Sequence, residues 1–70
     1  MNLYNLGKVC KEYRKVLGVS QDIVANETGY TRQNISKFEN GNNINVIILA
    51  WYFNNGLTIE DLKKGGALWK

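Results

Sequence analysis

Apolar residues recur at helical spacing in the first part of the chain, with charged residues between them. Lys8, Lys11, Glu12 and Lys15 lie between the apolar residues. Intervals of three and four residues bring side chains to one face of a helix, so this segment predicts an amphipathic helix. Gly18 marks its end, because glycine is common just past a helix C-terminus. The apolar residues are Leu6, Val9, Cys10, Tyr13, Val16 and Leu17.

Two shorter helices are predicted next, between residues 20 and 41. Ser20 is a favourable N-cap for the first of them, and Thr31 caps the second. Gly29 permits the positive φ that a tight turn between helices requires, and Gly41 closes the second helix. Four apolar residues then face inward at helical spacing: Val24, Ala25, Ile35 and Phe38.

The remainder of the chain predicts two more helices. Asparagines offer caps for a helix from about Asn45 to Asn54. Thr58, followed three residues later by Asp61, opens a short helix from Ile59 to Lys64. Apolar alternation never persists, so no strand is expected. The predicted fold class is all-α, a compact bundle of five short helices.

The fourth predicted helix is apolar on every side, since residues 46–53 read VIILAWYF. A helix in a small bundle buries only one stripe. We expect the core stripe to be Val46, Leu49, Ala50 and Phe53. The other side chains then form a dimer or partner surface: Ile47, Ile48, Trp51 and Tyr52. Its cover is a second copy of the chain, a folded-back tail from Ala67 to Trp69, or a different protein.

Length, charge and cysteine content limit the possible domain organisation and partners further. The 70 residues predict one domain over 1–64 and a C-terminal tail over 65–70. Nine basic and six acidic residues give a net charge of +3, which favours an anionic partner. Cys10 is the only cysteine, and its place among apolar residues predicts a reduced thiol in the core.

Several functional classes find no support in the sequence. There is no histidine, and the six carboxylates are scattered or suited to capping, so we expect neither an enzyme, a metal site nor a cofactor. The longest apolar run, residues 46–53, is far shorter than the roughly 20 residues of a membrane span. No signal peptide pattern is visible, and we expect a cytoplasmic protein.

The outer face of the third predicted helix carries side chains that suit DNA bases. Arg32 can donate two hydrogen bonds to guanine O6 and N7, and Gln33 can pair with adenine N6 and N7. Ser36 and Lys37 return to the same side one turn later. These four residues are the predicted base readers, the alternative being a solvated face with ordinary polar residues.

The segment from Ser20 to Gly41, SQDIVANETGYTRQNISKFENG, resembles the helix-turn-helix family of Cro and the phage repressors, the Xre or lambda-repressor-like fold. The resemblance covers about Leu6 to Leu62. Three departures stand in the segment: Thr28 replaces a usually apolar residue, Ile23 replaces a usually charged one, and no proline follows Gly41. The residues that carry the resemblance are Ser20, Gln21, Ala25, Gly29, Ile35, Phe38, Glu39, Asn40 and Gly41.

The resemblance implies a sequence-specific, double-stranded DNA-binding transcriptional regulator, with the helix over 31–40 in the major groove. Family members commonly bind as dimers to palindromic operators. The resemblance also implies an ion pair between Arg14 and Glu39, and base contacts from the four residues above. For Asn40 and Asn42 an ordinary turn or cap role is the alternative. The predicted phosphate contacts are Gln21, Thr31, Asn40, Asn42 and Lys11.

A second functional class remains open. The same fold can serve as a protein-interaction module that inhibits or recruits another regulatory protein. Ile23, Tyr30 and the outer side of the fourth helix would then form the contact surface. The salt dependence of binding distinguishes the two hypotheses. Phosphate contacts make DNA affinity fall steeply with salt, whereas an apolar protein interface would respond little.

Overall fold

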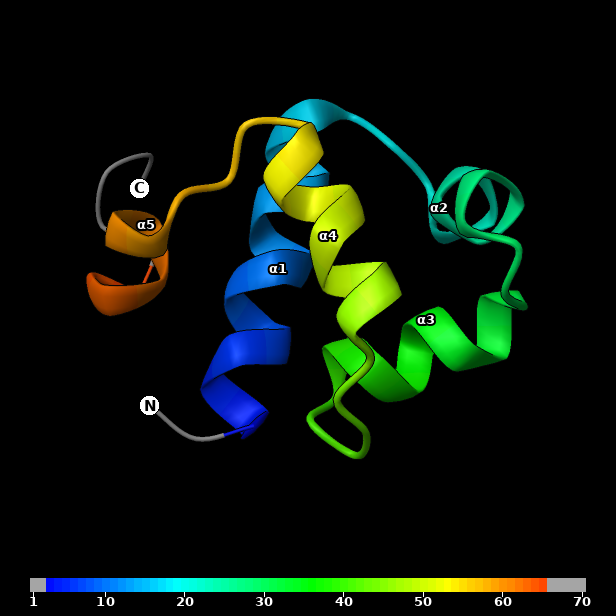
Figure 1. Cartoon of the computed structure of the whole chain (residues 1–70), viewed down its shortest axis with the longest axis horizontal. Helices are drawn as coiled ribbons and strands as arrows, with labels where there is room; N and C mark the ends of the chain where they lie inside the picture. The colour runs from blue at the N-terminus through cyan, green and yellow to red at the C-terminus, as the bar shows by residue number, and fades with distance from the viewer. Residues whose placement is uncertain (1–2, 66–70) are drawn as a thin grey trace.

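Five helices make up the computed structural model, which describes the backbone of residues 3–65 and the side chains of residues 6–65 (Figure 1). No strand occurs in this range, so the predicted all-α class and number of helices are confirmed for it. The predicted tail beyond Gly65 lies outside the described residues. The helices are α1 Leu3–Leu17, α2 Gln21–Thr28, α3 Arg32–Glu39, α4 Val46–Asn54 and α5 Ile59–Lys63.

Side-chain caps start the helices at the predicted positions. The Ser20 hydroxyl accepts a hydrogen bond from the backbone N–H of Ile23. Thr31 forms a capping box with Asn34, and Thr58 forms one with Asp61. Each cap satisfies N–H groups that have no partner inside the helix, so these short segments have well-defined starts.

The end of α3 has the geometry that a glycine allows. Gly41 has φ +78°, and Asn40 is the C-cap just before it. The N–H of Gly41 donates to the carbonyl of Phe38, and the N–H of Asn42 donates to the carbonyl of Lys37. This pair of bonds satisfies two carbonyls that the helix leaves open, and it ends α3 as predicted.

α3 packs mainly against α1 and α2, α4 packs mainly against the same two helices, and α5 packs mainly against α1. In Figure 1, α2 and α3 therefore lie on one side of the molecule and α5 on the other. Within the described residues, no helix is both long and apolar enough to cross a membrane. The buried apolar core comprises Leu6, Val9, Cys10, Val24, Ala25, Ile35, Phe38, Ile48, Trp51, Tyr52, Leu57 and Leu62.

The predicted burial of α4 is wrong in most positions, although Leu49 and Phe53 pack against the core as expected. Ile48, Trp51 and Tyr52, assigned to an outer surface, are buried in the core, with Ile48 only 1% exposed. Val46, assigned to the core, is 71% exposed, and Leu49, Ala50 and Phe53 are half-buried. Of the predicted partner surface, only Ile47 stands exposed, at 54%.

Polar groups on the two aromatic side chains explain which face of α4 is inside. The Trp51 indole N–H donates to the Glu27 carboxylate at 2.7 Å, and the Tyr52 hydroxyl donates to Glu39 at 2.6 Å. Tyr52 also stacks on Phe38 with 6.1 Å between ring centroids. Because buried N–H and O–H groups need partners, these bonds select the Trp51 and Tyr52 face over an equally apolar alternative.

The last turn of α1 also differs from its predicted pattern. Val16 and Leu17 are exposed, although their spacing placed them on the apolar face. Val19, which follows the turn at Gly18, packs against the core instead. Val19 lies beyond the end of α1, so helical spacing does not describe the direction of its side chain.

α1 and α3 approach each other closely at Gly7. A Cβ built there would collide with the carbonyl oxygen of Phe38 and would lie 2.7 Å from the carbonyl oxygen of Glu39. Backbone atoms on both sides form this contact, so no side-chain rotation could relieve it. The position therefore requires glycine for steric reasons.

Candidate nucleic-acid interface

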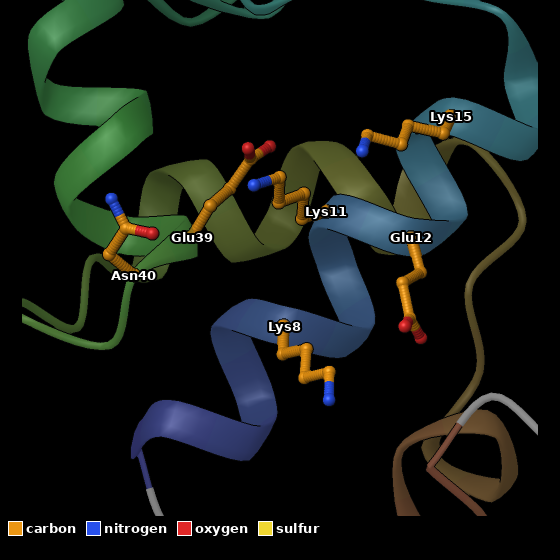
Figure 2. A pocket seen from close by; sticks show the side chains of 6 residues that line it. All are labelled: Lys8, Lys11, Glu12, Lys15, Glu39 and Asn40. Atoms are coloured by element: carbon orange, nitrogen blue, oxygen red, sulfur yellow. The ribbon is translucent and has the colours of Figure 1, made fainter.

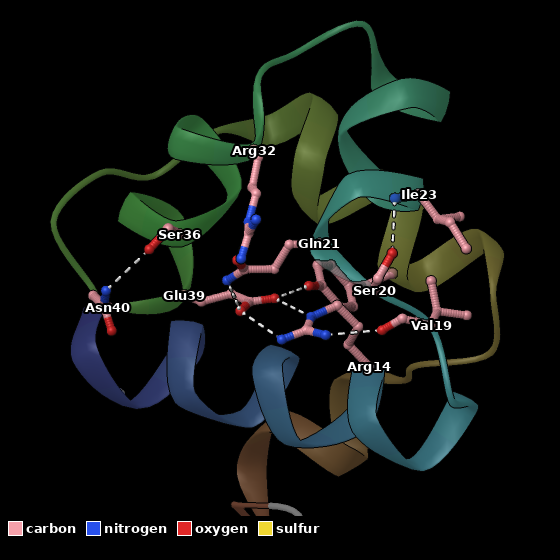
Figure 3. A network of polar contacts seen from close by, with 10 residues as sticks. Arg14, Val19, Ser20, Gln21, Ile23, Arg32, Ser36, Glu39 and Asn40 are labelled. Carbon is pink, nitrogen blue, oxygen red and sulfur yellow. Dashed lines mark hydrogen bonds and ion pairs between the residues drawn. The ribbon is translucent and has the colours of Figure 1, made fainter.

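The outer face of α3 presents the four predicted base readers. Arg32, Gln33 and Lys37 are exposed, and Ser36 is half-buried. The Ser36 hydroxyl accepts a hydrogen bond from the Asn40 side chain at 3.4 Å (Figure 3). Polar side chains are thus available along the two turns of this helix, opposite the buried Ile35 and Phe38.

The predicted phosphate contacts fall at the two ends of α3. Thr31 caps the start of the helix, and Gln21 lies beside it, with its Oε1 3.4 Å from Arg32 Nε. Asn40 and Asn42 are exposed at the other end. Lys11 joins Asn40 there, because both residues line one surface hollow.

That hollow lies between α1 and the end of α3 (Figure 2). Lys8, Lys11 and Lys15 contribute to its rim from one side of α1. Two carboxylates also line it, but Glu39 is paired with an arginine and Figure 2 shows Glu12 directed away from Lys11 and Lys15. Lys8 and Lys15 were not among the predicted contacts, although their spacing from Lys11 was a signal for a basic row.

The predicted ion pair between Arg14 and Glu39 is present and buried. Arg14 Nε lies 2.7 Å from Glu39 Oε2, and Arg14 Nη2 lies 3.2 Å from Oε1. Arg14 Nη1 donates in addition to the backbone carbonyl of Val19 at 2.8 Å. Hydrogen bonding to Glu39 raises the pKa of Arg14, against the opposing effect of burial.

Glu39 has further partners that the sequence did not reveal. Gln21 Nε2 donates to Oε1 at 3.0 Å, and the Tyr52 hydroxyl donates to Oε2 at 2.6 Å. The carboxylate, only 3% exposed, therefore accepts four hydrogen bonds from three side chains. Burial, and then the bond to Glu39, raise the pKa of Tyr52 above its ordinary range. We call these residues, Arg14, Gln21, Glu39 and Tyr52, the Glu39 network.

The Glu39 network connects the core to the outer face of α3. Its members come from α1, α2, α3 and α4, so one carboxylate ties four helices together. Gln21 continues the chain of contacts outward to Arg32 (Figure 3). The orientation of α3, and of the side chains on its outer face, is thereby fixed relative to the rest of the domain.

Cys10 is a buried free thiol, as predicted. Burial, with a smaller contribution from the charge on Glu39, raises its pKa from 9.0 to about 12. A thiolate is the reactive form, so Cys10 is inert in the folded protein. No cluster of three potential metal ligands occurs among the described residues.

Raising the pH above about 9 is expected to destabilise the fold. Cys10 stays neutral in the native state up to about pH 12 but ionises near pH 9 when unfolded, so its stabilising effect is complete below pH 9 and is lost above it. The free energy of unfolding then falls by about 1.4 kcal/mol per pH unit for this group. Thermal melts across this range check the effect, with Cys10→Ala as the comparison. Equal alkaline losses in the two proteins would assign the effect to other groups.

Comparison of the chain with protein-family models, curated proteins and solved structures gave no match.

Proposed function

We propose that the protein is a sequence-specific, double-stranded DNA-binding transcriptional regulator of the Cro and phage-repressor type. In this proposal α2 and α3 form a helix-turn-helix, with only residues 29–31 between them. α3 enters the major groove, which accommodates an α-helix. The observation that carries the proposal is the exposed polar face of α3 together with its attachment to the core through Glu39. Such a regulator acts in the cytoplasm of a bacterial or phage-infected cell.

Base contacts would come from Arg32, Gln33, Ser36 and Lys37. The exposed guanidinium and amide groups near the start of α3 can each form two hydrogen bonds with one purine. Sequence discrimination therefore concentrates on Arg32 and Gln33.

Phosphate contacts would hold the two ends of α3 against the DNA backbone. The Gln21 amide donates one of its two hydrogens to Glu39, so its second hydrogen and the backbone N–H at the start of α2 could both contact a phosphate. Thr31 adds contacts near that end. Lys11, Asn40 and Asn42 serve the other end, where Lys8 and Lys15 extend the positive charge.

A homodimer on a palindromic operator is part of the proposal. Two copies of α3 would then lie one turn of DNA apart, about 34 Å. The surface expected from the sequence cannot form the interface as a whole, because three of its four residues are buried. Sedimentation of the free protein and of its DNA complex measures the number of copies.

Selection of bound duplexes from a random pool tests the proposal directly. Enrichment of a short palindrome is expected, and binding of that duplex should weaken steeply with salt because phosphate contacts release counterions. A folded protein that enriches no sequence would contradict the proposed function.

Arg32→Ala is expected to weaken operator binding by about 1–3 kcal/mol and to relax the preference at one base position. Lys11→Ala, the comparison variant, should weaken binding to all sequences alike, because a phosphate contact carries no sequence information. Titrations of both variants on the selected duplex and on random duplex measure the difference. An equal loss on both duplexes for Arg32→Ala would contradict its assignment to a base.

A protein-interaction module is the second candidate. Ile23 on α2 and Tyr30 in the following turn are exposed large apolar residues. With Ile47 on the outer side of α4, they offer a surface to another regulatory protein. Binding to such a partner would respond little to salt, in contrast to binding to DNA.

A further inference from the structure

Asp22 places a negative charge on the surface that faces DNA in the proposed function. It lies in the first turn of α2, and its Oδ1 is 4.0 Å from Arg32 Nε. Both side chains extend into solvent, Asp22 with 70% and Arg32 with 69% exposure. An acidic residue beside a base-reading arginine weakens the general electrostatic attraction of this surface to DNA.

Arg32 contacts α2 through one nitrogen of its guanidinium group, Nε. Asp22 and Gln21 both approach Nε, from two successive positions of the chain. Figure 3 shows the Arg32 side chain extending from the start of α3 towards Gln21. The terminal nitrogens Nη1 and Nη2 can still donate to the O6 and N7 of a guanine while Nε keeps its neighbours.

The Asp22 carboxylate also lines a hollow in which Arg32 could meet a phosphate. This hollow at the start of α2 is lined by Ser20, Gln21, Asp22 and Arg32, with Arg14 beneath them. The helix N-terminus and the arginine both attract anions there. Asp22 already places a carboxylate beside Arg32, and it repels a phosphate that approaches the guanidinium group.

We propose that Asp22 is a specificity-determining residue, which holds Arg32 for a guanine edge and penalises contacts of Arg32 with the phosphates of unrelated DNA. A phosphate that binds Arg32 must either separate it from Asp22 or approach the carboxylate. A guanine edge in the groove requires neither. The inference rests on the proposed function, and it predicts that Asp22 increases the ratio of operator affinity to random-DNA affinity.

Asp22→Asn tests this role by removing the charge while keeping the shape of the side chain. Affinity for random duplex is expected to rise roughly five-fold, the effect of one unit charge at about 4 Å in water. Affinity for the selected operator should rise less, so the specificity ratio falls. Asp22→Glu restores the charge and should restore most of the ratio, which a purely structural role in α2 would not require.

Glu60→Gln is the matched control, because it removes an exposed negative charge from α5, on the other side of the molecule. It should change both affinities slightly and equally. If Asp22→Asn changed the affinities for operator and random duplex equally, Asp22 would act only through the net charge of the protein. That result would overturn the inference, while the proposed function would stand. A wild-type chain that binds no duplex would overturn both.

Nuclear magnetic resonance tests the contact with Arg32 without DNA. The chain has only two arginines, so two Nε–H signals are expected, from the buried Arg14 and the exposed Arg32. Asp22→Asn should move the Arg32 signal and speed its exchange with water, while the Arg14 signal stays constant as an internal reference. An unchanged Arg32 signal would show that Asp22 does not hold the side chain.

Discussion

Glu39→Ala is expected to lower the free energy of unfolding by about 3–5 kcal/mol. The variant leaves the Arg14 guanidinium buried without its carboxylate and removes the acceptor of the Tyr52 hydroxyl. Desolvated groups without partners cost far more than the intact pair contributes. A small domain has only a few kcal/mol of stability, so much of the variant should be unfolded at 37 °C.

Denaturant titration and thermal melts measure this loss, with Glu12→Ala as the comparison. Both substitutions remove one glutamate, but Glu12 is half-buried at the rim of a surface hollow and Glu39 lies inside the Glu39 network. Tyr52→Phe should cost less, about 1 kcal/mol, because it removes one of four hydrogen bonds to the carboxylate. Equal melting temperatures for Glu39→Ala and Glu12→Ala would dispose of the structural role of the ion pair.

Gly7→Ala is expected to lower the free energy of unfolding by about 1–3 kcal/mol. Helix propensity alone predicts the opposite sign, a gain of about 1 kcal/mol for alanine inside α1. The steric effect is larger because the new methyl group would meet the backbone of α3 at Phe38 and Glu39. α1 and α3 would have to move apart, and this movement would also strain the bonds between Arg14 and Glu39.

Lys8→Ala provides the control for Gly7→Ala, because Lys8 is the next residue in α1 and is exposed. Alanine is favourable there and meets no neighbouring backbone, so the melting temperature should change little. A Gly7→Ala protein as stable as Lys8→Ala would show that α1 and α3 tolerate a wider separation. Chemical shifts of α3 in Gly7→Ala would reveal the movement directly.

The starts of the helices could be predicted from the sequence because local chemistry determines them. Ser20, Thr31 and Thr58 each cap a helix with their own side chains, and the positive φ at Gly41 ends α3. Each of these features depends on residues within one turn of the chain. Spacing and residue type were therefore sufficient to place them.

The buried face of α4 could not be predicted in this way. Its eight apolar residues give no periodic contrast, so the pattern carries no information about orientation. The orientation depends on Glu27 and Glu39, which are 24 and 13 residues away from their partners Trp51 and Tyr52. The ion pair between Arg14 and Glu39 was predicted only through a family resemblance. The hydrogen bonds from Gln21 and Tyr52 to Glu39 could not be predicted, because these residues are also far from Glu39 along the chain.

The attachment of Glu39, the last residue of α3, to three other helices leaves that helix without a hinge of its own. In the proposed function, α3 therefore docks as a rigid body, and the double helix has to change its shape to fit. Flexible pyrimidine–purine steps bend at lower energetic cost than A-tracts. Operators should therefore differ in affinity at base pairs that no side chain touches, in the order of their stiffness.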